Sequence, residues 1–199
     1  MAAPITHIVL ADKVLKNLPN ISRKEFFIGT SFPDIRYIRV IERDKTHAKD
    51  ISLEDIKNKD SFQAGFLLHS LVDTLQVAYH LNHKNERAPE KGLMLQAFKL
   101  FEDKVLYEKL SDWNTIAGYM DSVLPQETEL VANKDNVVKW HNILKDYMSQ
   151  APSPESRAPF FKELYFTPEQ TQQIEEYIKE MESDPTLVTF VENFYRDTL

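Results

Sequence analysis

The feature that most constrains the fold is the stretch SFQAGFLLHSLVDTLQVAYHLNH, residues 61 to 83. Apolar side chains recur in it every three or four residues, which is the spacing that gathers them on one side of an α-helix. We therefore predict a long central helix here. Its apolar positions are Phe62, Phe66, Leu67, Leu71, Leu75 and Ala78.

Composition favours helices in the rest of the chain as well. Only 4 glycines occur among 199 residues, so tight turns are scarce, and many segments are rich in Leu, Lys, Glu and Gln. These residues favour helices over a many-stranded sheet, and we expect an all-α, multi-helix bundle. Gly29 is predicted to end the second helix, and TSFPDIRYI after it to form an irregular loop. Helices are expected at about residues 6–18, 22–28, 53–57, 89–110, 113–124 and 133–148, and from Thr167 and Asp184 onward.

A proline- and serine-rich stretch, SQAPSPESRAP at residues 149–159, is predicted to be a linker or surface loop. It separates a helical domain of residues 1–150, which contains every candidate site residue, from residues 151–199. The second part would hold the linker and two C-terminal helices. These helices either stand out as an acidic appendage or pack back on the same domain, and we favour packing.

Charge and residue usage exclude several classes of protein. The formal net charge of −7 argues against a broad nucleic-acid surface, which would need Lys and Arg to meet phosphates. Because the chain has no cysteine, it has neither disulfides nor thiolate zinc sites, and His, Asp and Glu must hold any transition metal. Neither a signal peptide nor a transmembrane segment is recognisable, so a cytoplasmic protein is expected.

Candidate metal ligands lie on one face of the central helix. Each residue of an α-helix turns about 100°, so His69 and Asp73, four residues apart, lie nearly above one another and can reach one ion. Gln76 and His80 share their face, and His83 falls on a nearby bearing. Histidine with carboxylate is the usual ligand set when thiols are absent. The alternative for an isolated HxxxD pattern is an ordinary polar pair on a solvated face.

Three further residues complete the candidate set, although each alone has an ordinary structural explanation. His7 could be a histidine at a helix start, Asp34 a turn aspartate after Pro33, and His47 a solvated loop residue. Phe32, Tyr37 and Tyr79 lie near these residues in the sequence and could line a substrate pocket, or could be ordinary core aromatics.

Together these residues occur in a familiar order. The segments PITHIVLA, FIGTSFPDI, KTHAKD and GFLLHSLVD resemble, in order and spacing, the motifs of the zinc-dependent phospholipase C and S1/P1 nuclease superfamily. The cytoplasmic bacterial phospholipase C-like branch is the nearest match. The resemblance covers roughly residues 3–83 and implies a helical bundle with a metal site on its central helix.

The resemblance also implies roles for individual residues. His7 would bind one zinc ion, and Asp34 and His47 would bind another. His69 would be a further ligand, and the carboxylate of Asp73 would bridge the two ions. The family's remaining ion needs a further histidine, which His80 or His83 could supply, and an HxxxE pair. No such pair follows, because Lys145 stands four residues after His141. We therefore expect two zinc ions and an incomplete set for a third.

These roles suggest a metal-dependent phosphoric ester hydrolase that acts on a small-molecule or lipid phosphoester. Two metal ions would activate a water, and Asp34 could serve as general base as well as ligand. The alternative is a catalytically degenerate protein on the same scaffold that binds metal or a partner without turnover. The adjacent His-Asp pair of the HD-domain phosphohydrolases, another helical and metal-dependent class, does not occur.

Overall fold

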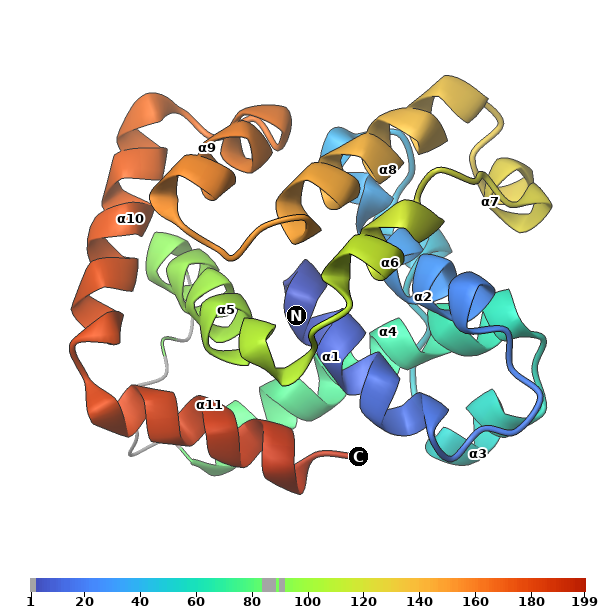
Figure 1. The fold of residues 1–199 in the computed structure, drawn as a ribbon, viewed down its shortest axis with the longest axis horizontal. Helices are drawn as coiled ribbons and strands as arrows, with labels where there is room; N and C mark the ends of the chain where they lie inside the picture. Colours follow the sequence, from blue (N-terminus) through green and yellow to red (C-terminus); the bar gives the residue numbers. More distant parts are fainter. Residues whose placement is uncertain (1–2, 84–88, 90–91) are drawn as a thin grey trace.

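The structure, a computed structural model, describes residues 3–83, 89 and 92–199. All regular elements in these residues are helices, which confirms the all-α prediction (Figure 1). The α-helices are α1 (Pro4–Leu15), α2 (Arg23–Ser31), α3 (Leu53–Lys57), α4 (Ser61–Asn82), α5 (Gly92–Leu106), α6 (Trp113–Tyr119), α7 (Pro125–Leu130), α8 (Lys134–Met148), α9 (Pro154–Glu163), α10 (Pro168–Glu182) and α11 (Pro185–Asp197). Three 3-10 helices complete the set: η1 (Phe32–Ile38), η2 (Arg43–Lys45) and η3 (Tyr107–Lys109).

Helix α4 is the long helix that the apolar spacing predicted. It begins after Asp60, whose side chain accepts a hydrogen bond from the backbone N–H of Gln63. Helix α2 lies along it, and α1 packs on both (Figure 1). These three helices with η1 provide most of the surroundings of the candidate site.

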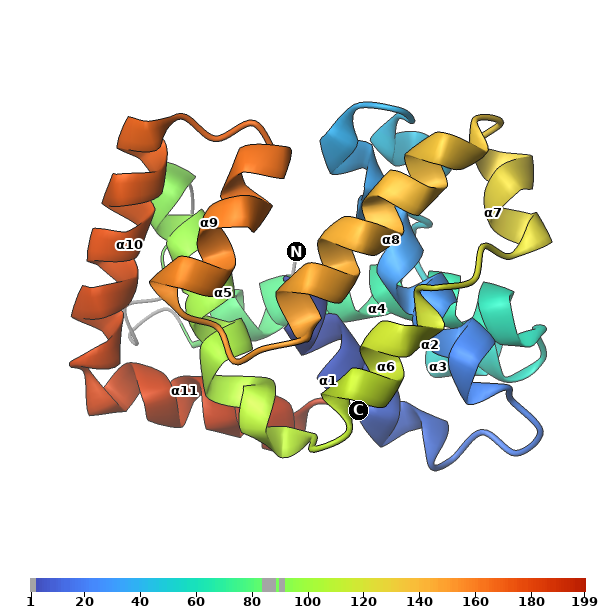
Figure 2. The same cartoon turned by 45° about the horizontal axis from the view of Figure 1, so that its top comes forward.

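The C-terminal helices pack against the middle of the chain. Helix α10 lies along α5, α11 also contacts α5, and α9 contacts α8 (Figure 2). The end of α11 is tied to α1 because Lys13 Nζ donates to the backbone oxygens of Tyr195, at 2.9 Å, and Thr198, at 2.6 Å. An ammonium group is favourable there because the last carbonyls of a helix lack partners within the helix.

Several sequence-based boundaries were wrong for identifiable reasons. Gly29 does not end α2 but lies inside it, facing α4, and residues 32–38 form η1 instead of an irregular loop. The predicted linker contains the start of α9, where Ser153 caps the helix and Pro154 occupies the first turn. The first helix starts at Pro4 rather than Thr6. Helix α7 was not predicted.

Candidate metal centre

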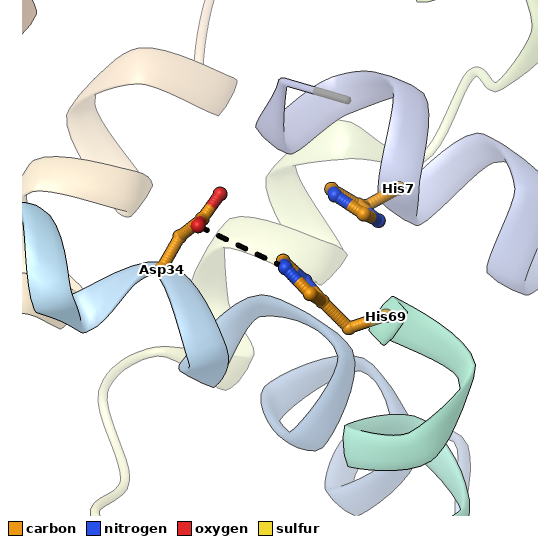
Figure 3. A group of neighbouring side chains, drawn as sticks. All are labelled: His7, Asp34 and His69. Carbon is orange, nitrogen blue, oxygen red and sulfur yellow. Dashed lines mark ion pairs between the residues drawn. The ribbon is translucent and has the colours of Figure 1, made fainter. Parts of the chain in front are cut away.

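Five side chains that are distant in the sequence converge on one buried position. His7 comes from the first turns of α1, Asp34 from η1, His47 from the loop after η2, and His69 and Asp73 from successive turns of α4. All five are buried. Figure 3 shows three of them, His7, Asp34 and His69, facing one another. Two overlapping sets of ligand atoms have the spacing to hold an ion: His7, Asp34 and His69, and His47, His69 and Asp73, with His69 able to ligate one ion at a time.

The distances between these polar atoms exceed hydrogen-bonding length but suit a shared cation. His69 Nε2 lies 3.8 Å from Asp34 Oδ1, and His47 Nε2 lies 3.9 Å from the same oxygen. Zinc bonds of 2.0–2.1 Å in a tetrahedron imply ligand atoms about 3.3–3.4 Å apart. The site is therefore slightly wider than a filled zinc site, and small side-chain movements would close it.

The two oxygens of Asp73 face different histidines. Oδ1 lies 3.4 Å from His7 Nε2, and Oδ2 lies 3.5 Å from His47 Nε2. A carboxylate that bridges two ions must present its oxygens in this way. The geometry therefore fits the bridging role that the resemblance implies for Asp73.

The buried polar atoms around this position that have no hydrogen-bond partner among the described residues include four candidate ligand atoms. These four are His7 Nε2, His47 Nε2, His69 Nε2 and Asp34 Oδ1. Leaving a buried polar atom unsatisfied costs about 1–3 kcal/mol each. Because these atoms gather at one place, one or two bound cations would satisfy all of them, and the residues present fit a zinc centre.

Hydrogen bonds on the far side of two imidazoles prepare their Nε2 atoms as metal ligands. His69 Nδ1 lies 2.9 Å from the carbonyl oxygen of Thr30, which can only accept, so Nδ1 carries the proton. His47 Nδ1 lies 2.8 Å from Thr46 Oγ1, whose hydroxyl donates to the carbonyl of Arg43 and can therefore accept from the ring. Such outer hydrogen bonds fix the tautomer and the orientation of metal-binding histidines.

Burial and neighbouring charges also shift the pKa values of the candidate ligand side chains. Burial and the neighbouring His7 hold the pKa of His69 well below its usual range, so its imidazole is neutral and available to a metal. Burial raises the pKa of Asp73, but the contacts with His47 and His7 outweigh burial and leave its pKa below the ordinary value. Asp34 differs, because burial and then the charge of Asp73 raise its pKa. Of the two carboxylates, Asp34 is therefore the more basic.

Two arginines that sequence reasoning missed flank the carboxylates. Arg36 Nη2 lies 3.3 Å from Asp34 Oδ1, and Arg43 Nη2 lies 3.6 Å from Asp73 Oδ2. Arg36 follows Asp34 by two residues, so a 3-10 turn in that segment would have been the signal. Both arginines provide positive charge at the edge of the centre.

A buried carboxylate from α5 holds the start of α1 and hence the helix that carries His7. Helix α1 has no side-chain cap of its own. Asp103 instead accepts hydrogen bonds from the backbone N–H groups of Ile5, at 3.2 Å, and Thr6, at 2.7 Å. It also accepts from the hydroxyls of Thr6 and Tyr147. The ring of His7 is stacked on His69 with centroids 3.8 Å apart.

Asp103→Asn is expected to flatten the dependence of stability on pH. Burial raises the pKa of Asp103 to about 7, although hydrogen bonds from Thr6 and Ile5 favour the ionised form. The unfolded carboxyl titrates near 3.9, so the folded state holds the extra proton between these values. Its stabilising contribution, at most about 4 kcal/mol, is complete below about pH 4 and is lost as the pH rises through 7. Urea unfolding of both proteins between pH 4 and 7.5 measures this difference, and parallel profiles would contradict it.

His80 lies outside both sets of candidate ligands. Its Nε2 is 3.3 Å from Glu102 Oε1 on α5, and Gln76 donates to the other oxygen of Glu102. Glu102 was missed in the sequence because FKLFEDKV mixes charged and apolar residues at helical spacing, and a charged residue in such a stretch is ordinarily assigned to the solvated face. In an HxxxE pair that ended at Glu102, the histidine would stand four residues earlier, where this chain has Phe98. The ring of Phe98 packs edge-on against His80, with centroids 5.1 Å apart. The structure therefore places a histidine and a glutamate side by side, with phenylalanine at the position where an HxxxE pair would have its histidine.

The other residues that the sequence singled out have separate surroundings. His83 stacks on Tyr79, whose ring also contacts Phe190 and Phe194. His141 is paired with Glu127 at 2.7 Å. Phe32 packs against Phe62 and Phe66 in the core. Tyr37 alone of the three proposed pocket aromatics lines a cavity beside Asp34.

Comparison with known proteins adds no relatives. No protein family, no curated protein and no solved structure matches the chain. Within the described residues, every helix is too short or too polar to cross a membrane. Function must therefore be argued from the centre itself.

Proposed function

We propose that the chain is a metal-dependent hydrolase of phosphoric esters, similar to phospholipase C, that holds two zinc ions with His7, Asp34, His47, His69 and Asp73. One observation carries the proposal: three imidazole Nε2 atoms and a carboxylate oxygen are buried together without hydrogen-bond partners among the described residues. The order of these residues in the sequence, which resembles the phospholipase C and P1 nuclease superfamily, supports the choice of zinc and of phosphoester substrates.

The protein groups at the centre have distinct tasks in such a reaction. Bound zinc would supply a Lewis acid that polarises a phosphoryl oxygen and lowers the pKa of a water. Asp34, the more basic of the two carboxylates, would help to hold an ion and would accept the proton of the attacking water. Arg36 and Arg43 add positive charge beside the two carboxylates, where the phosphoester would lie. The buried setting strengthens each of these electrostatic effects because little water screens them.

A second function is favoured by the same arginines. Because Arg36 and Arg43 contact Asp34 and Asp73, the two carboxylates have counter-charges supplied by the protein. Phe98 beside His80 leaves the third metal position incomplete. Both observations fit a catalytically degenerate protein that kept the scaffold in order to bind metal or a partner. The two functions differ in whether zinc-loaded protein turns over a phosphoester.

Metal analysis of purified protein tests the proposal directly. We expect about two zinc ions per chain, release of zinc by a chelator, and a lower melting temperature afterwards, since a ligand that binds only the folded state stabilises it. Zinc-loaded protein should hydrolyse p-nitrophenyl phosphate or its bis ester, and chelated protein should not. Absence of stoichiometric zinc would overturn the proposal. Zinc without turnover would favour the degenerate protein.

A further inference from the structure

A small cavity adjoins the candidate metal centre. Asp34 and Tyr37 from η1 form one side, and Gln96 and Lys99 from α5 form another. Its volume is about 50 Å³, enough for a compact group. The remaining walls are largely apolar and come from α5, α8, α9 and the turn after α9: Leu100, Trp140, Phe160, Phe161, Leu164 and Phe166.

Lys99 is unusual in this apolar setting. Only 4% of the residue is exposed, whereas lysine is almost never fully buried unless it is paired. An ammonium group has three donor hydrogens. Among the described residues, Lys99 Nζ makes one hydrogen bond, a long one of 3.3 Å to Gln96 Oε1. The cavity therefore contains a buried amino group with donor capacity to spare.

The charge around Lys99 depends on the metal centre. Burial lowers the pKa of Lys99, and the carboxylates of Asp34, Asp73 and Glu102 oppose this effect. Two of those carboxylates are the proposed metal ligands. Once Asp34 and Asp73 share their charge with bound cations, they no longer compensate the ammonium group. An anion that enters the cavity would then restore the balance.

We propose that this cavity is a substrate subsite in which Lys99 binds an anionic phosphoryl oxygen while the aromatic walls contact an uncharged, apolar substituent. The inference deepens the proposed function and rests on it. The ammonium group of Lys99 disfavours a substrate whose attached group is cationic, such as phosphocholine. The substrate class is therefore a phosphoester of an uncharged, apolar alcohol or phenol.

Binding of inorganic phosphate to zinc-loaded protein tests the role of Lys99 without requiring turnover. Lys99→Met keeps an unbranched side chain, one atom shorter, and removes the ammonium group. Lys104→Met is a matched control on the same helix, because Lys104 pairs with Glu182 outside the cavity. Calorimetry should show phosphate binding weakened at least about ten-fold in Lys99→Met and within two-fold of wild type in Lys104→Met. Zinc content should be equal in all three proteins.

Substrate choice provides the second measurement. Wild type should hydrolyse p-nitrophenyl phosphate faster than p-nitrophenylphosphorylcholine, and Lys99→Met should shift this ratio toward the choline ester at least about ten-fold. If zinc-loaded Lys99→Met binds phosphate as wild type does, the subsite is overturned while the metal-dependent function stands. If wild type holds no zinc, the proposed function fails, and the subsite fails with it. A wild-type preference for the choline ester would also overturn the subsite.

Discussion

Replacing Asp73 by asparagine is expected to weaken zinc binding at least about a hundred-fold. Changes to residues that merely support metal ligands already cost 10–100-fold, and Asp73 contacts two histidines of the centre directly. Asparagine keeps one oxygen and replaces the other by an NH2 group, so it can serve one ion at most. It also removes a negative charge that holds two cations together. Both ions should therefore be affected by this single change.

The control for Asp73→Asn is His83→Asn, at the end of the same helix. His83 is hydrogen bonded to the backbone of Tyr79 and lies in neither set of candidate ligands. Titration against a coloured chelator gives the zinc affinity, and circular dichroism shows whether each variant is folded. We expect His83→Asn to retain wild-type zinc. Equal retention by folded Asp73→Asn would contradict the bridging role.

The parts of the centre that follow regular periodicity could be predicted from the sequence, and those set by packing could not. The apolar spacing of α4 is strong enough to locate the helix and to place His69 and Asp73 on one face. No periodicity links η1 or the loop after η2 to that face. Asp34 and His47 were joined to it by the resemblance in motif order, and the structure brings these residues together.

Buried charges were the main omission. Glu102, Asp103 and Lys99 lie on α5 in a stretch with helical spacing, where a charged residue is ordinarily assigned to the solvated face. All three are buried instead. The partners of the two carboxylates, Thr6 for Asp103 and Gln76 for Glu102, come from other helices, and the register between helices cannot be predicted from the sequence. Only the packed structure shows that Glu102 and Asp103 have partners and that Lys99 is buried beside them.

Helix starts with proline were a second omission. In the predicted linker, Ser153 caps α9 and Pro154 lies at its first positions, the same arrangement that identified α10 at Thr167 and Pro168. The high proline and serine content of residues 149–159 obscured it. Gly29 shows the converse case, because a glycine expected to end a helix is instead required where two helices touch.

Gly65→Ala is expected to destabilise the protein by about 3 kcal/mol or more. A Cβ atom at Gly65 would lie 2.0 Å from the backbone oxygen of Phe26 and 2.8 Å from the backbone nitrogen of Thr30. Backbone cannot rotate away as a side-chain end can, so α2 and α4 would have to separate. The contact is close in the other direction too, because a Cβ atom added at Gly29 on α2 would lie 2.1 Å from the backbone oxygen of Phe62 on α4.

Separation of α2 from α4 should also reach the metal centre. The carbonyl of Thr30 on α2 accepts the hydrogen bond that orients His69 on α4, and Asp34 follows α2 directly in η1. Gly65→Ala should therefore lower zinc affinity about ten-fold or more, as loss of an outer hydrogen bond does, in addition to stability. Urea unfolding and chelator titration measure the two effects separately.

Gly118→Ala on α6 is the matched control for this change. A Cβ at Gly118 meets no atom within 4 Å, and the residue lies in a helix, where alanine is favoured over glycine by about 0.5–1 kcal/mol. The two substitutions add the same methyl group, so they should change the free energy of unfolding in opposite directions. Equal effects would show that α2 and α4 are not in the close contact that orients His69.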